Sequence, residues 1–263
     1  MNELINESRK LHETFAMKPP LFFKKYLFFI FISLYASAQA QIQLGLRVAP
    51  ALSFTQAKDL GYYYRYTSGG EAGFGGSIGP TADFFLTHSL SISTGLWYTV
   101  KAANINFNTG MGVYYYDENG RIYQRIFEDA SSQYILSYLQ LPLTLKGYTK
   151  ESSSGIRFYV QMGGSFDLRV GEKALNADEN LLFQVSYLQN RDESLFKAHG
   201  WSLYAGLGLE KKVGDRTLFF AGLAYQRTIG NQINSEQVQS ALFSLNPISV
   251  RYQLPALEMG VKF

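Results

Sequence analysis

Three histidines are the residues of this chain best suited to acid–base or metal chemistry, and their spacing favours neither. His12 precedes an apolar segment, His88 lies between two strand-like segments, and His199 comes just before another. Metal sites and hydrolytic triads need further ligands, a nucleophile or an acid close to the histidine. Only His199 has such neighbours, Ser194 or Asp192, and a polar loop histidine is by far the better explanation. We therefore predict a non-enzymatic protein with no catalytic residue, no metal site and no cofactor; a lipid-modifying enzyme using His199 is the third-ranked alternative.

Composition excludes several other classes of protein. The chain has no cysteine, which rules out a disulfide scaffold, a thiolate zinc site and a cysteine nucleophile. A net charge of only +3 gives no reason to expect a nucleic-acid partner. The mean hydropathy of −0.09 rules out a polytopic helical membrane protein, which needs several long apolar runs. Aromatic residues at 16% with 24 glycines indicate β-structure, yet 17% charged residues is low for a soluble β-domain.

The N-terminal forty residues have the three parts of a secretory signal. Lys24-Lys25 precedes the apolar run 26–35, and the small-residue stretch 36–40 offers cleavage after Ala38 or Ala40. The run is too short for a membrane anchor, which needs about 20 apolar residues. We expect residues 1–40 to be an N-terminal extension and cleaved signal peptide, with Met1 or Met17 as the start, and residues 41–263 to form one domain.

The rest of the chain alternates apolar and polar residues with period two and shows no sustained helical period. We predict eight strands, at about residues 41–54, 72–86, 89–101, 134–147, 156–169, 201–211, 217–227 and 249–263. In the last one, Val250, Tyr252 and Leu254 are out of phase with the apolar residues that follow Pro255. The phase change predicts a β-bulge at this proline.

The connections alternate between short and long. Residues 87–88, 149–155 and 214–215 form short connections, whereas 55–71, 102–133, 170–200 and 228–248 form long ones. The second long loop contains two strand-like runs, 113–116 and 121–124, which predict a hairpin, and residues 173–189 suit a short helix. Short turns on one side and long loops on the other are typical of bacterial outer-membrane barrels.

Period two alone does not say which face of a barrel points inward. A soluble, lipocalin-like barrel binding a small apolar ligand would enclose the apolar face, and a membrane barrel would turn that face to lipid. Three features favour the membrane barrel: the opposite face is rich in Gly, Ser and Thr, the chain is exported, and its strand number is even. The alternating apolar end at Phe263 also resembles the signal that outer-membrane barrel assembly machinery recognises.

The faces predicted to point inward carry six cations and four anions. An eight-stranded barrel is just wide enough for its side chains to fill it, so we expect these groups to pair as a polar plug rather than to line a selective pore or proton path. The cations are Arg47, Lys101, Lys146, Arg157, Arg169 and Lys262, and the anions are Asp83, Asp167, Glu210 and Glu258. Glycines such as Gly208 would make room for large neighbours such as Tyr159.

Aromatic residues have two further predicted places. Tyr98, Trp201, Phe219 and Tyr225 suit the aromatic girdles at the two membrane interfaces. The tyrosine-rich runs 62–66 and 114–116 lie in long loops, where such residues either bind a glycan or protein partner or pack on each other.

The fourth predicted strand carries a family resemblance. Residues 137–146, SYLQLPLTLK, resemble the Tyr-Leu-(Glu)-(Ile/Leu)-Pro-Leu-x-Leu-Lys strand of PorT-family outer-membrane β-barrel domains. Together with Gly45-Leu46-Arg47, the Ala-Gln end of the signal and the terminal 260–263 segment, the resemblance covers about residues 41–263. It implies a Bacteroidota outer-membrane protein. The founding member is linked to protein secretion and gingipain transport, a role that is not carried over, and Gln140 replaces the usual acidic residue.

The sequence thus predicts a monomeric, eight-stranded antiparallel up-and-down transmembrane β-barrel in the cell outer membrane. The expected partners are outer-membrane lipid, the barrel assembly machinery during biogenesis, and a protein or glycan at the extracellular loops. The predicted role is structural, adhesive or secretion-associated.

Overall fold

The computed structural model describes residues 42–59, 72–107, 111–116, 121–127, 130–176, 194–214, 217–234 and 248–263. The predicted signal segment 1–40, the tyrosine run 62–66, Asp192 and most of the predicted helix at 173–189 lie outside the described residues. The first three residues of that predicted helix, 173–175, belong to a strand instead. Within the described ranges, no helix has both the length and the apolar character needed to cross a membrane.

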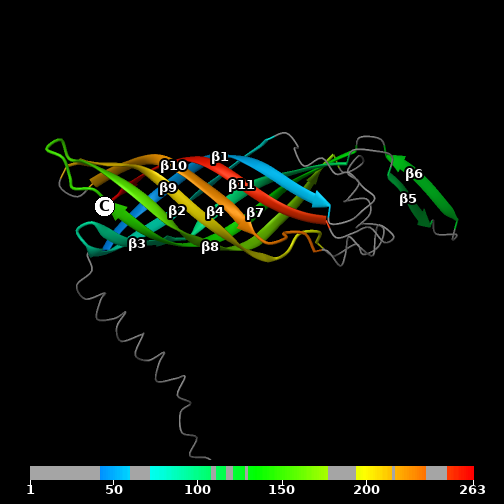
Figure 1. The fold of residues 1–263 in the computed structure, drawn as a ribbon, viewed down its shortest axis with the longest axis horizontal. Coiled ribbons are helices and arrows are strands. Elements are labelled where there is room, and N and C mark those ends of the chain that lie inside the picture. The colour runs from blue at the N-terminus through cyan, green and yellow to red at the C-terminus, as the bar shows by residue number, and fades with distance from the viewer. Residues whose placement is uncertain are drawn as a thin grey trace, which may run out of the picture. The chain divides into compact units, whose positions relative to one another are not determined.

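The strands of the described residues form a closed antiparallel ring (Figure 1). Consecutive strands pair with each other, and β1 pairs with both β2 and β11, which closes the barrel. The strands of the ring are β1 Ile42–Asp59, β2 Gly73–Thr87, β3 Leu90–Gly95, β4 Trp97–Phe107, β7 Ala130–Tyr148, β8 Ile156–Leu175, β9 His199–Val213, β10 Thr217–Ile229 and β11 Ile248–Lys262. Because β3 and β4 together form one interrupted strand, the described ring is an eight-stranded barrel, as predicted.

The interruption between β3 and β4 has a local cause. Both strands keep one register against β2 and one against β7, so they form a single wall. That register places Pro80 opposite Leu96, and Pro142 opposite Gly95. Because proline has no N–H to donate, the ladder loses hydrogen bonds on both sides of this point. The prediction of one strand at 89–101 is therefore confirmed, with a break at Leu96 that the prolines impose.

Short turns join the strands at one end of the barrel, the turn end, and longer connections join them at the other, the loop end. Gly155 and Gly214 lie in two of the short turns with φ of 74° and 82°, values that glycine adopts without strain. Because short turns face the periplasm in barrels of this kind, the loop end faces the outside. One long connection contains the hairpin of β5 Met111–Tyr116 and β6 Ile122–Phe127, which confirms the predicted hairpin.

The predicted bulge at Pro255 is wrong. Strand β11 keeps one register against both β1 and β10 along its whole length, so Val250, Tyr252 and Leu254 point into the barrel and Leu257 and Met259 point out of it. The apolar pattern changes phase because the lumen is apolar near the loop end and polar further down. A bulge does occur in β8, where the register shifts opposite Ser137 and Tyr138.

Candidate functional site

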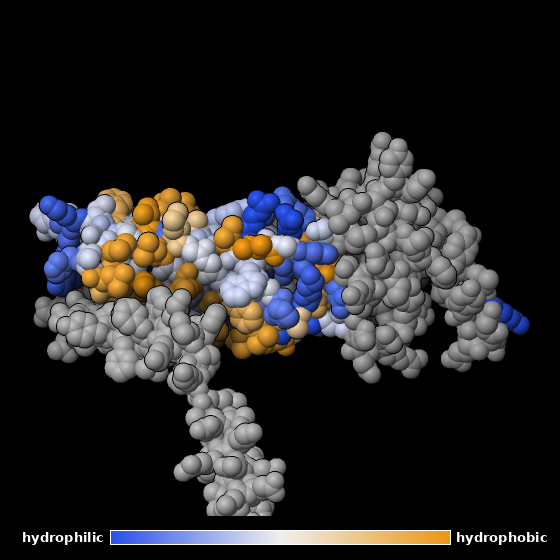
Figure 2. Space-filling model, turned by 60° about the horizontal axis from the view of Figure 1, so that its bottom comes forward, coloured by the Kyte–Doolittle hydropathy of each residue, from blue (hydrophilic) through white to orange (hydrophobic). Residues whose placement is uncertain are grey.

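The outer and inner faces of the barrel are inverted relative to a soluble protein. Outward side chains such as Leu143 and Met162 are 64% and 68% exposed, whereas Lys101 and Glu210 in the lumen are fully buried. Figure 2 shows the result as an apolar band on the barrel surface with hydrophilic residues beyond it. All four aromatics predicted for the girdles are exposed on this outer face. The prediction that the charged face is enclosed is confirmed, and nothing supports the soluble, lipocalin-like alternative.

Five charged residues fill the lumen near the turn end, and we call them the turn-end cluster: Asp83, Lys146, Arg157, Glu210 and Lys262. Glu210 accepts hydrogen bonds from Lys146 Nζ at 3.0 Å and from Arg157 Nη2 at 2.6 Å, and from Lys262 Nζ. Lys262 also donates to Asp83, whose carboxylate lies 3.8 Å from Lys146 Nζ. Tyr148 donates to the same carboxylate at 3.0 Å. Three cations thus share two buried carboxylates.

A second cluster, the central cluster, is built around Glu258 and Arg47. Arg47 Nε donates to Glu258 at 3.1 Å, and its guanidinium lies 4.0 Å from the ring centroid of Trp97. The same carboxylate accepts from Tyr204 at 2.7 Å, Tyr159 at 2.6 Å and Gln161 at 2.7 Å. Glu258 therefore has four donors, which come from β1, β8 and β9 and tie opposite walls of the barrel together.

Two glycines create the space that Tyr159 occupies. A Cβ added at Gly208 would come within 2.6 Å of the Tyr159 hydroxyl, and one added at Gly222 within 2.7 Å. Real Cβ atoms do not make contacts as short as these, so only glycine fits at these two positions. The predicted role of Gly208 is confirmed, whereas Gly222 was not singled out from the sequence.

The next layer towards the loop end is the Asp167 cluster, made of Lys101, Gln140, Ser165, Asp167 and Ser202. Asp167 Oδ2 accepts from Lys101 Nζ at 2.9 Å and Ser202 Oγ at 2.6 Å, and its Oδ1 accepts from Gln140 Nε2 at 2.8 Å and Ser165 Oγ at 2.7 Å. Gln140 in turn accepts from the hydroxyl of Thr99 at 2.6 Å. The neutral amide of Gln140 thus supplies a donor to Asp167, which a carboxylate at this position lacks.

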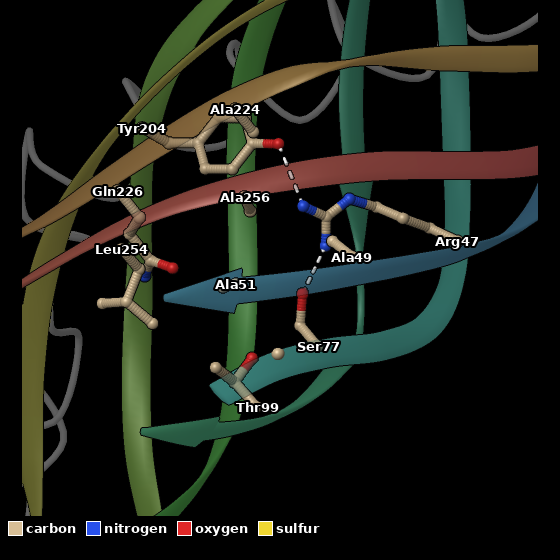
Figure 3. A pocket seen from close by; sticks show the side chains of 11 residues that line it. Arg47, Ala49, Ala51, Ser77, Thr99, Tyr204, Ala224, Gln226, Leu254 and Ala256 are labelled. Atoms are coloured by element: carbon tan, nitrogen blue, oxygen red, sulfur yellow. Dashed lines mark hydrogen bonds between the residues drawn. The ribbon is translucent and has the colours of Figure 1, made fainter. Parts of the chain in front are cut away.

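A small pocket lies beside the central cluster (Figure 3). Arg47 extends along it, with hydrogen bonds from its guanidinium to Ser77 and Tyr204, and Ala49, Ala51, Ala224 and Ala256 are among the lining residues. Its volume is about 10 Å³, close to the minimum that one water molecule needs. The pocket is therefore too small for an organic ligand.

The lumen at the loop end is closed by apolar side chains that we call the apolar cap. Leu195 and Phe196 before β9, and Ile233 after β10, fold into the barrel mouth, where an isolated β-bridge joins Phe196 to Ile233. The ring of Phe196 packs edge-on against Tyr134 with centroids 5.1 Å apart. The remaining members come from strands β1, β4, β7 and β11: Ala51, Ala57, Ala103, Ile105, Leu136, Tyr138, Val250, Tyr252 and Leu254. This cap is not predictable from the sequence pattern, because its loop residues lack the period-two signal.

All ten predicted lumen charges have ionic partners among the described residues. Only Arg169 has a partner outside the predicted set of ten: it pairs with Glu172 across the β8 bulge and also donates to Ser194. The predicted strand ends at Arg169, so Glu172 was expected in the loop that follows. The polar-plug interpretation agrees with these contacts.

The histidine-based alternative finds no support in the described geometry. His199 is exposed and stacks on Phe166 with ring centroids 6.4 Å apart. Ser194 Oγ donates to the carbonyl of Phe196 at 2.8 Å and accepts from Arg169, so its hydroxyl proton is engaged elsewhere. Within the described ranges, no group of three His, Asp or Glu side chains is arranged to hold a metal ion.

A closed antiparallel ring of eight strands, apolar outside and charged inside, defines an integral outer-membrane β-barrel protein. The family comparison agrees, because the model of the "Outer membrane protein beta-barrel domain" family matches residues 36–234. The chain belongs to this family and lies in the cell outer membrane.

Several solved structures are similar to the chain at low sequence identity. OprG from Pseudomonas aeruginosa is 12% identical, with 84% of this chain and 95% of that chain covered and a TM-score of 0.47. Neisserial surface protein A is 13% identical, with 85% and 99% covered and a TM-score of 0.41. Ail from Yersinia pestis, in complex with the heparin analogue sucrose octasulfate, is 11% identical, with 85% and 99% covered and a TM-score of 0.38. No curated protein sequence matches the chain.

Proposed function

We propose that this protein is a closed, non-enzymatic barrel that acts at the cell surface through its extracellular loops, in a structural, adhesive or secretion-associated role. The observation that carries the proposal is the filled lumen: three ionic layers and an apolar cap follow one another along the described barrel. A barrel filled in this way offers no path for solutes, so we infer that the protein acts through its surface-exposed segments.

The absence of conduction is the first expected result. Purified protein inserted in a planar lipid bilayer is expected to show no ion conductance, because paired charged side chains and the apolar cap fill the described lumen. A porin inserted under the same conditions serves as the positive control. Reproducible unitary conductance steps from the purified protein would show that the lumen opens and would refute the proposal of a closed barrel.

The hairpin β5–β6 is the most extended loop element that the structure describes, and it is the first segment to test. Phe107 and Ala130 are the last paired residues of β4 and β7, so an Asn-Gly turn joining them replaces residues 108–129 without disturbing the barrel. We expect this variant to fold and insert normally, and to lose the binding of surface partners that the parent retains. Crosslinking on intact cells measures the loss, with heat-dependent gel mobility as the folding control. Unchanged crosslinked products would exclude the hairpin as the contact element.

The family resemblance supports a narrower assignment. We propose that the chain is a PorT-family protein of a Bacteroidota outer membrane, because Leu139, Leu141, Leu143 and Leu145 face lipid while Gln140 and Lys146 face the lumen, as the SYLQLPLTLK pattern requires. Insertion by the barrel assembly machinery follows from the same proposal.

Residues 1–40 are proposed to be an extension and signal peptide that is removed on export. N-terminal sequencing of protein extracted from outer membranes is then expected to begin at Gln39 or Gln41, since cleavage follows small residues at positions −3 and −1. A sequence beginning at Met1 or Met17 would contradict removal of the segment.

A further inference from the structure

Two arginines lie on the outside of the barrel near its loop end. Arg227 of β10 and Arg251 of β11 are both exposed and both at outward-facing positions. Arg227 is opposite Gln253, and Arg251 precedes Gln253 by two residues on the same face of β11, so the two arginines are diagonal neighbours. Their guanidinium groups can therefore reach one ligand. We call them the arginine pair.

Aromatic residues show the height of the arginine pair relative to the membrane. Tyr225 precedes Arg227 by two residues on the same face of β10. Ile229 follows Arg227 by two residues on that face, and Trp201 of β9 lies opposite Ile229. Trp201 is 60% exposed and Tyr225 is 41% exposed on the outer wall. Tyrosine and tryptophan in such places mark the boundary between hydrocarbon and headgroups. The arginine pair thus lies among these interfacial aromatic residues, at headgroup height.

The arginine pair also differs from the lumen arginines in its electrostatic setting. No carboxylate of the described residues pairs with Arg227 or Arg251, whereas Arg47, Arg157 and Arg169 each have one. Lys173 and Lys197 are exposed towards the same end, on β8 and just before β9, and extend the positive charge. A lipid-facing arginine is tolerated at the interface because an anionic headgroup can neutralise it.

We propose that the arginine pair binds the phosphate groups of a phosphorylated lipid in the outer leaflet of the membrane. The guanidinium fork matches phosphate geometry with two parallel hydrogen bonds, and it is more weakly hydrated than an ammonium group. Two such forks side by side, with aromatic rings beside them to contact the acyl region, form a complementary surface for a phosphorylated headgroup. The site lies on the lipid-facing wall, so its ligand arrives from the membrane rather than from solution. This inference rests on the outer-membrane location and not on the proposed loop function.

The test uses the full chain purified in detergent, with lipid A bearing two phosphates as the probe and the same lipid stripped of phosphate as its comparison. The double variant Arg227→Gln/Arg251→Gln is expected to bind the phosphorylated probe at least ten-fold more weakly than the parent, measured by native mass spectrometry. The double variant Arg227→Lys/Arg251→Lys is expected to fall between them, because lysine keeps the charge but loses the fork. The stripped lipid is expected to bind all variants equally weakly.

The matched control is Lys211→Gln/Lys212→Gln, which removes the same charge from exposed residues at the turn end. It is expected to bind like the parent, and heat-dependent gel mobility confirms that every variant is folded. Three results would overturn the proposal: unchanged binding by the arginine-to-glutamine variant, an equal loss in the lysine control, or displacement of the lipid by millimolar inorganic phosphate. The last result would mean that the arginine pair takes a free anion instead.

Discussion

Replacing Glu210 by glutamine is expected to lower the free energy of unfolding of the barrel by about 3–5 kcal/mol, the range found when one partner of a buried ionic group is removed. Glu210 is fully buried and pairs with Lys146, Arg157 and Lys262. Without its charge, Lys146 and Lys262 keep only the carboxylate of Asp83, and Arg157 loses the carboxylate with which it pairs. Mutual repulsion and unmet desolvation then act together in the turn-end cluster.

Urea unfolding in lipid vesicles, followed by tryptophan fluorescence and gel mobility, measures the change. Glu151→Gln is the matched control: Glu151 is exposed in the turn between β7 and β8, and its loss is expected to change stability by less than about 0.5 kcal/mol. Adding Arg157→Gln to the Glu210 variant is expected to restore part of the stability, because it removes one of the three cations. Equal stability of the Glu210 and Glu151 variants would contradict the ionic role assigned to Glu210.

Changing Gln140 to glutamate is expected to cost about 3 kcal/mol or more, although the two side chains have nearly the same shape. The amide nitrogen of Gln140 lies 2.8 Å from Asp167 Oδ1, and the amide oxygen accepts from Thr99. A glutamate here places two carboxylates against one lysine, Lys101, in a fully buried site. We therefore expect an acidic residue at position 140 to be incompatible with Asp167 in this barrel.

The paired variant Gln140→Glu/Asp167→Asn provides the decisive comparison. It exchanges the carboxylate and the amide, so the new amide at position 167 donates to the new carboxylate at position 140 while Lys101 keeps an anionic neighbour. We expect the exchange to recover most of the lost stability in the same urea experiment, which a purely steric effect would not allow. If the paired variant is as unstable as Gln140→Glu alone, the proposed complementarity between residues 140 and 167 is wrong.

The two faces of the barrel were predictable because neighbouring residues of a strand point in opposite directions. The leucines at positions 139, 141, 143 and 145 alternate with Gln140, Thr144 and Lys146. The structure places the leucines on the outer face of the barrel and the polar residues in the lumen. The direction of the inversion followed from the small, polar character of the enclosed face. Alternation gave the wrong prediction at Val250, Tyr252 and Leu254, where a bulge was expected. The lumen is apolar at this level, so apolar residues that point inward cannot be told from apolar residues that point outward.

The sequence by itself determined the class of protein, the number of strands and the set of charges that must be enclosed, since all three depend on local alternation and on loop lengths. Only the tertiary structure decided which carboxylate meets which cation, how Leu195, Phe196 and Ile233 close the mouth, and that Glu172 neutralises Arg169. These contacts join residues from strands and loops far apart in the chain. They depend on strand tilt and register around the closed ring, and alternation within a single strand carries no information about either.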